Sequence, residues 1–184
     1  MTYDSDMPPS YEITIKYHTE DKDIHTMDAY LMADAIKGFA DFSSVTGKYS
    51  FNDLEYHTSI SEVRPGCVEI QFIINSIAYL PSFITTGISF YETVRELIKV
   101  FKHLGGEPPA KVFSEENGNI TIRNCNNNDI NITQNTYQIA QDPATSKSAQ
   151  NFISKPLKKG SSEVTLQANQ NELSSVTREE ADNF

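Results

Sequence analysis

The stretch VEIQFIINSIAYLPSFITTGISFYETVRELIKVFKHL, residues 68–104, is the richest apolar segment of this 184-residue chain. Within it, residues 70–91 form a run of 22 without a charged side chain. Such a run is long enough on paper to cross a hydrocarbon layer of about 30 Å. Nine of the 22 residues are nevertheless polar, Gly or Pro, which is too many for a helix that faces lipid. The composition therefore favours a segment that is buried in protein.

The period of the apolar residues changes inside this stretch. Residues 68–74 alternate between apolar and polar side chains, which predicts a strand with one buried face. After Ser76 the apolar residues recur at spacings of three and four and form two neighbouring rows, which predicts a helix near 80–104. Its first part, 80–91, is expected to be covered on more than one side, whereas charged residues from Glu92 onward make its end amphipathic. Gly105 and Gly106 are expected to end it, because glycine readily adopts the left-handed conformation of a helix cap.

Upstream, residues 11–17 alternate as a strand, and Thr26 is the expected cap of a helix that runs to about Ser43. Residues 50–63 follow as a strand and are joined to the strand at 68 by the turn at 64–66. The fold class is therefore α+β. We expect a β-α-β-β antiparallel sheet with one packed helix, then a long apolar helix and a small β-rich C-terminal segment.

The C-terminal segment begins with a shift in composition. Eight Asn lie within residues 117–135, and the isoleucines among them alternate as in two short strands, 119–123 and 129–134, with 136–140 as a continuation. A helix is expected from Pro143 and a strand at 163–168. Thr177 and Glu180 form a capping box. Because this start signal lies close to Phe184, we also consider that the chain is a fragment of a longer protein.

The chain is accordingly divided into three parts: a disordered leader at 1–10, an α+β domain at 11–106 that includes the long helix, and an Asn-rich β segment with a short helix at 107–184. The formal net charge is −10, with 13 acidic and 5 basic residues through Glu69. This surplus disfavours nucleic acid as a partner, because phosphate contacts need Lys and Arg. Two cysteines and no recognisable secretion signal predict a cytoplasmic location, with membrane association as the alternative.

Metal-ligand side chains are densest between the first strand and the first helix, at His18, Asp21, Asp23 and His25. A loop of this kind can hold a metal ion, but the spacing matches no known motif, so we favour a solvated acidic loop. Cys67 is expected to be a structural thiol rather than a nucleophile. No catalytic motif is present, and we assign no catalytic residue, resident metal or cofactor.

Three functions remain as hypotheses. The favoured one is a non-enzymatic assembly or adaptor module of a cytoplasmic homo-oligomer, with another protein as an alternative partner. The second is a membrane-associated effector subunit whose run 70–91 meets lipid on assembly, and the third is a small metal-dependent enzyme that uses the loop 18–25. The residues predicted at the oligomer interface are apolar residues or glycine of the long helix and the Asn-rich strands: Phe83, Gly87, Phe90, Ile120, Ile122, Ile130 and Ile132.

Overall fold

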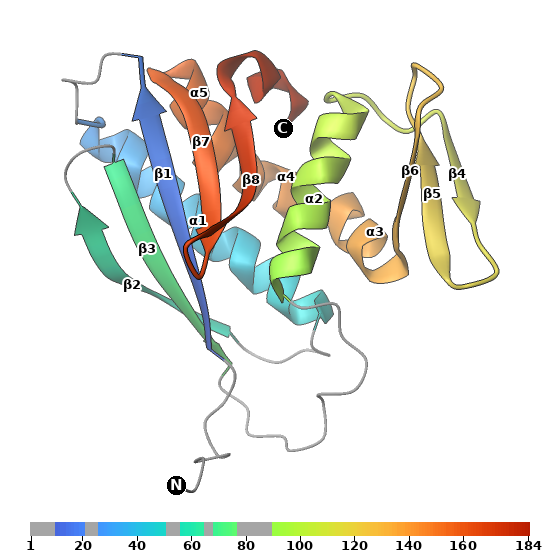
Figure 1. Cartoon of the computed structure of the whole chain (residues 1–184), viewed down its shortest axis with the longest axis horizontal. Helices are drawn as coiled ribbons and strands as arrows, with labels where there is room; N and C mark the ends of the chain where they lie inside the picture. Colours follow the sequence, from blue (N-terminus) through green and yellow to red (C-terminus); the bar gives the residue numbers. More distant parts are fainter. Residues whose placement is uncertain (1–9, 21–25, 51–55, 65–67, 77–89) are drawn as a thin grey trace, which may run out of the picture.

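A five-stranded antiparallel sheet, backed by helices, and a separate three-stranded sheet make up the computed structural model of this chain (Figure 1). The structure describes residues 10–20, 26–50, 56–64, 68–76 and 90–184. Helix α2 (Phe90–Leu104) lies between the two sheets, with α3 (Gln134–Gln141) beside it (Figure 1). The α+β fold class predicted from the sequence is confirmed, and so is the opening order of strand, helix and two strands.

The larger sheet has the strand order β2-β3-β1-β7-β8. Its strands are β1 (Ser10–Thr19), β2 (Tyr56–Arg64), β3 (Val68–Ser76), β7 (Ser161–Ala168) and β8 (Asn171–Thr177). Strand β1 pairs with β3 on one side, where Ile13 lies opposite Phe72, and with β7 on the other, where Ile15 lies opposite Leu166. Strands from both ends of the chain thus share one sheet, and part of the segment 107–184 is hydrogen-bonded to the segment 11–106.

Helices cover one face of this sheet. They are α1 (Ala29–Ser50) and a continuous helical run made of α4 (Pro143–Ala149), the π-helical turn η1 (Gln150–Ser154) and α5 (Lys155–Lys158). Phe39 of α1 lies against Phe72 of the sheet and Phe152 of η1, with ring centroids 4.5 and 5.4 Å apart. Gly38 permits this close packing, because a Cβ there would lie 2.6 Å from the Asn151 Cβ.

Helix α1 differs from the prediction at both ends. It is capped by Asp28, whose Oδ1 accepts hydrogen bonds from the backbone N–H of Tyr30 and Leu31 at 3.0 Å, and not by Thr26. It continues to Ser50 instead of ending near Ser43. The predicted strand start at Ser50 is therefore wrong, because the polar residues of the last helical turns are offset by Val45 and Tyr49, which pack against the core.

Helix α2 (Phe90–Leu104) belongs to both hydrophobic clusters of the structure. Phe90, Leu97 and Phe101 are buried in the main core, whereas Val100 packs against the three-stranded sheet. The predicted amphipathic end of this helix is confirmed, because Glu92, Arg95 and Lys99 are exposed whereas Val94, Leu97 and Ile98 are buried. The predicted helical residues 80–89 lie outside the described residues.

The smaller sheet consists of β4 (Lys111–Ser114), β5 (Asn119–Arg123) and β6 (Asp129–Thr133), in that order. Its next element is α3 (Gln134–Gln141), so the strand predicted at 136–140 is a helix. Thr133 ends the strand and caps α3, because its Oγ1 accepts a hydrogen bond from Thr136 N at 3.2 Å. This cap outweighs the strand preference of the Thr, Tyr and Ile residues that follow.

The last elements are the β7–β8 hairpin and the short 3₁₀ helix η2 (Arg178–Asn183). Positive φ angles at Asn169 and Gln170 make the tight turn of the hairpin. The predicted capping box at Thr177 and Glu180 is present, and Phe184 packs against Phe101 with ring centroids 5.6 Å apart.

Candidate functional site

A cleft of about 780 Å³ opens at one end of the larger sheet. Its walls come from the end of β1, the first turns of α1, the junction of α5 and β7, and Arg178 after β8. The volume lies in the range of small-molecule sites, which is roughly 300–1,000 Å³. The cleft is therefore the first candidate for a catalytic or ligand-binding site.

The floor of the cleft includes apolar and aromatic side chains from three elements: Tyr17, Met27, Leu31 and Val68. The Tyr17 hydroxyl is buried and donates a hydrogen bond to the Phe152 carbonyl oxygen at 3.0 Å. Burial raises the pKa of this phenol far above its ordinary value of 10.0. Tyr17 is thus a neutral side chain with a structural hydrogen bond, and it does not act as a general acid or base at neutral pH.

The charged side chains at the rim largely pair with one another. Lys155 Nζ lies 3.1 Å from an Asp34 carboxylate oxygen, and Arg178 lies 2.8 Å from Glu20. Arg178 also donates to the carbonyl oxygens of Gly160 and Ser161, both at 3.1 Å. These contacts hold the rim together, and they bring no nucleophile and general base into contact among the described lining residues.

The predicted metal ligands are only partly visible. Asp21, Asp23 and His25 lie outside the described residues. His18 belongs to strand β1 rather than to a loop, and its Nε2 lies 3.1 Å from Thr165 Oγ1. Among the residues that the structure describes, no group of three His, Cys, Asp or Glu side chains is arranged to hold a metal ion.

The residues predicted at the oligomer interface fall into two groups. Phe83 and Gly87 lie outside the described residues. Phe90, Ile120, Ile122 and Ile132 are at most 2% exposed, and Ile130 is half-buried.

The chain itself covers the described residues of this predicted interface, Ile130 only in part. Phe90 lies in the main core, and the isoleucines pack on α2 and α3. A subunit contact through these seven residues stays a prediction, and the exposed apolar side chains of the small sheet are different ones.

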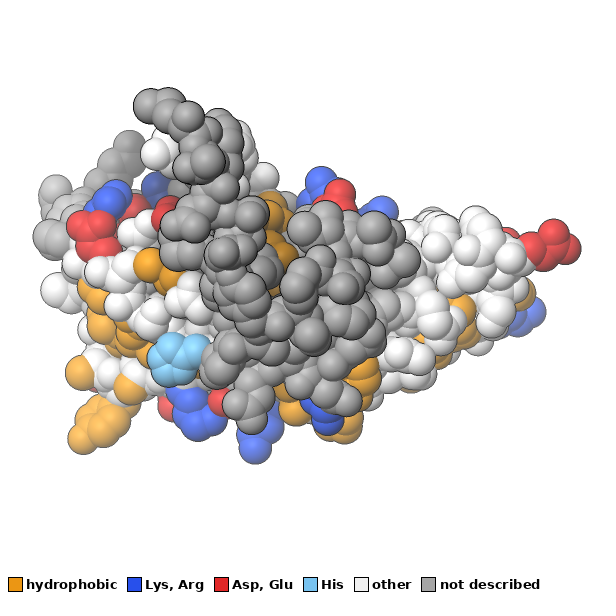
Figure 2. All heavy atoms as spheres, turned by 90° about the horizontal axis from the view of Figure 1, so that it is seen from below, with side chains coloured by type: hydrophobic (Ala, Val, Ile, Leu, Met, Phe, Trp, Pro, Cys, Tyr) orange, Lys and Arg blue, Asp and Glu red, His pale blue; other side chains and the backbone are white. Residues whose placement is uncertain are grey.

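Strand β4 is the exposed part of the small sheet. All four of its residues are exposed, and Val112 and Phe113 each keep 39% of their surface accessible. Figure 2 shows the molecule from below, where the narrow end formed by this sheet carries mostly uncharged polar side chains with hydrophobic ones between them. An exposed β-branched and an exposed aromatic side chain, one on each face of an edge strand, are unusual, because such edges invite pairing with another chain.

The outer face of the small sheet, which points away from α2, holds Phe113 in a fixed position. The Arg123 guanidinium lies 5.3 Å from the Phe113 ring centroid and donates two hydrogen bonds of 2.7 Å to Asp129. These bonds lower the pKa of the Asp129 carboxyl below its ordinary value. Asp129, Arg123 and Phe113 thus form a row across all three strands.

Sequence reasoning missed Val112 and Phe113 because four residues are too short for a period to be recognised. The signal that could have found them is the isolated apolar pair itself, which lies between Pro109 and the Asn-rich segment. The second exposed side chain of interest, Cys125, is a free thiol in the turn between β5 and β6. Cys67 lies outside the described residues.

Comparison with known proteins finds no matching protein family, no matching curated protein and no matching solved structure. No helix within the described parts of the chain is both long and apolar enough to cross a membrane. The structure is therefore interpreted from its own geometry.

Proposed function

We propose that this chain is a non-enzymatic assembly module whose copies associate through the exposed edge of the three-stranded sheet. The observation that supports the proposal is strand β4, which presents Val112 and Phe113 to solvent on an edge that no described element covers. Pairing of a second copy with this edge satisfies its backbone groups and removes both side chains from water.

The size of the small sheet supports self-association. Three strands of four or five residues make a sheet that is stable only because α2 and α3 cover its inner face. Pairing of two copies through β4 doubles the number of strands without any change in the fold of either chain. Because an exposed edge of four residues buries little surface, we expect a weak and reversible association rather than an obligate one.

The cleft gives less support to an enzyme. Its rim is occupied by ion pairs, and its buried tyrosine hydroxyl, that of Tyr17, is bonded to the backbone. A cytoplasmic location is part of the proposal and rests on the low cysteine content and the exposed free thiol of Cys125.

Sedimentation equilibrium over roughly 1–500 µM tests the proposal in the range expected of a small interface. We expect an average mass that rises above 20.7 kDa as the concentration increases. Val112→Asp should abolish this rise, because the charge would be buried at the seam. A mass of 20.7 kDa at every concentration of the wild type would disprove self-association.

Val63→Asp is the matched control. Val63 lies on β2, the edge strand of the larger sheet, and is 48% exposed. Val63→Asp makes the same chemical change at a similar exposure but outside the proposed interface, so it should leave the mass distribution as in the wild type. An equal loss in both variants would assign the effect to general repulsion between acidic chains.

A further inference from the structure

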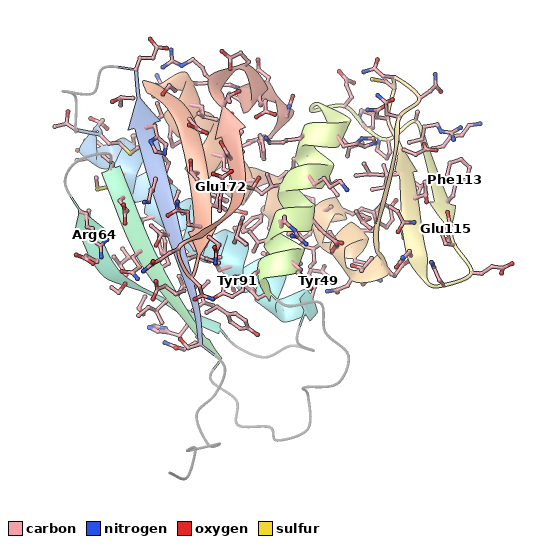
Figure 3. The ribbon with its side chains drawn as sticks, viewed as in Figure 1. Tyr49, Arg64, Tyr91, Phe113, Glu115 and Glu172 are labelled. Atoms are coloured by element: carbon pink, nitrogen blue, oxygen red, sulfur yellow. The ribbon has the colours of Figure 1, made fainter. Side chains whose placement is uncertain are left out.

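Along the outer face of the edge strand β4, the side chains are in turn basic, aromatic and acidic. Lys111 and Phe113 belong to β4, and Glu115 follows directly after it. The Glu115 N–H still bonds to the Asn119 carbonyl oxygen at 2.9 Å, which continues the pairing with β5 by one residue. Figure 3 shows Phe113 and Glu115 on the small sheet, at the end of the molecule away from the larger one.

The backbone of β4 has the right phase for a further strand. In an antiparallel pair, residues alternate between those bonded to the neighbouring strand and those whose N–H and C=O point away from it. Since Glu115 bonds to β5, Phe113 and Lys111 do so as well, in the register Phe113 to Thr121 and Lys111 to Arg123. Val112 and Ser114 therefore direct their backbone N–H and C=O groups to the open edge.

Lys111 has no acidic partner among the residues that the structure describes. It lies directly opposite Arg123, and this guanidinium is already engaged by Asp129. No described carboxylate lies within 4.0 Å of Lys111 Nζ, and like charges opposite each other destabilise a strand pair. A carboxylate delivered by a neighbouring strand would relieve this repulsion.

We infer that a second copy pairs with β4 in an antiparallel register centred on Phe113, so that each Lys111 lies opposite Glu115 of the other copy. This inference rests on the proposed function and specifies its interface. A two-fold axis perpendicular to the sheet keeps outer-face residues on one face, as a symmetric dimer requires. Phe113 then meets Phe113 of the second copy in a non-hydrogen-bonded pair, and Val112 bonds through its backbone to Ser114.

The neighbouring symmetric register is less favourable. Centring the pair on Val112 would place Glu115 opposite Pro109 of the second copy and leave both Lys111 side chains without a carboxylate. The basic, aromatic and acidic order on the outer face is self-complementary only in the register centred on Phe113. Opposite charges across strands stabilise a pair, as does an aromatic pair.

Charge reversal tests the register. Lys111→Glu and Glu115→Lys each place two like-charge pairs in the homodimer, so each should raise the dimer dissociation constant by roughly tenfold or more. The double variant Lys111→Glu/Glu115→Lys should restore wild-type association. An equimolar mixture of the two single variants should form a heterodimer, since every contact across the seam is then between opposite charges.

The outcomes separate this inference from the proposed function. A wild type that associates, with both single variants unchanged, would overturn the register and leave self-association intact. A wild type that stays monomeric would overturn both. Circular dichroism of each variant checks the fold, which we expect to be retained because Lys111 and Glu115 are exposed.

Disulfide trapping gives an independent measurement of the register. In a chain with Cys67→Ser and Cys125→Ser, Phe113→Cys should form a covalent dimer under a mild added oxidant, because non-hydrogen-bonded antiparallel partners lie at about 4.5 Å between Cα atoms. Val112→Cys should not, since its counterpart is displaced along the strand. Efficient trapping at Val112 and none at Phe113 would assign the other register.

Discussion

Three of the four edge strands in the described part of the chain, β2, β8 and β4, end their sheets in different ways. On β2, a bulge interrupts the register between Ile60 and Glu62, and Arg64 pairs with Glu62 and Glu69. Strand β8 lies beside α2, from which Lys102 Nζ donates to the Ser175 carbonyl oxygen at 2.5 Å.

Strand β4 has no bulge in its register with β5 and no described element beside it, and it is protected by its short length and by the charge of Lys111. Bulges, charges and covering elements are the usual means by which proteins prevent edge pairing. The comparison indicates that both edges of the larger sheet are protected, whereas the β4 edge of the smaller sheet has fewer of these protective features.

The largest effect should come from the helix that supports both sheets. Leu97→Asp places a charge at a side chain that is 0% exposed. An unpaired buried charge lowers the free energy of unfolding by roughly 3–5 kcal/mol, and the total for a domain is only about 5–15 kcal/mol. Chemical denaturation should show an unfolded or strongly destabilised chain. Lys99→Ala on the exposed side of α2 should remain within about 0.5 kcal/mol of the wild type. A Leu97→Asp variant with unchanged stability would show that this face of α2 is not buried.

Gly38→Ala should produce the next largest effect. The added Cβ would lie 2.6 Å from the Asn151 Cβ and 2.9 Å from the Ser148 carbonyl oxygen, so α1 must move away from the helical run beneath it. We expect a loss of about 1–3 kcal/mol, as is typical of overpacked cores. Because alanine otherwise favours a helix over glycine by about 1 kcal/mol, a gain in the free energy of unfolding would contradict the close contact.

Lys102→Met sharpens the comparison of the edges. It removes the hydrogen bond to the β8 carbonyl oxygen and the ion pair with Glu180, whose charged atoms are 2.8 Å apart. We expect a loss of about 1 kcal/mol in urea denaturation, because both side chains are partly solvated. Lys99→Met on the same helix serves as the control, since Lys99 is exposed and pairs with no described group. Equal stability of the two variants would mean that Lys102 does not stabilise the β8 edge.

The smallest effect concerns pH. Hydrogen bonds from Arg123 lower the pKa of Asp129 below its ordinary value of 3.8, so the ionised form is favoured in the folded chain. The stabilisation is present above the unfolded pKa and is lost as the pH falls through the lower, folded pKa. NMR titration of the Asp129 carboxyl should give this lowered value, and Arg123→Gln should return it toward 3.8. A titration that Arg123→Gln leaves unchanged would exclude this pair as the cause.

The elements that could be predicted from the sequence are the ones with a long period. Residues 11–17 and 68–74 alternate over a full strand, and the described part of the predicted helix at 80–104 repeats its apolar rows over four turns. Strands β4 and β8 were missed, because the first has four residues and the second carries Asn, Glu and Ser in most positions.

The exposed edge at β4 could not be predicted from the sequence, because the exposure of a side chain in the small sheet depends on which residues the helices α2 and α3 cover. The sequence predicts Ile120, Ile122 and Ile132 at a subunit interface, because the short Asn-rich strands have edges that a second chain could pair with. Helix α3, in the place of the strand predicted at 136–140, supplies Tyr137 and Ala140 to their cluster. Exposure is a property of the tertiary arrangement, so the sequence alone does not show that α3 covers these isoleucines, and their place at a subunit interface stays a prediction.

Helix α2 has a consequence for how the molecule denatures. It contributes Phe101 to one cluster and the adjacent Val100 to the other, and Ala140 also touches both. Neither sheet can lose its apolar cover without exposing residues on which the other depends. The two sheets should therefore melt together in one cooperative transition, with a calorimetric enthalpy equal to the van't Hoff enthalpy. In hydrogen exchange, the amides of β5 and those of β1 should show the same free energy of opening.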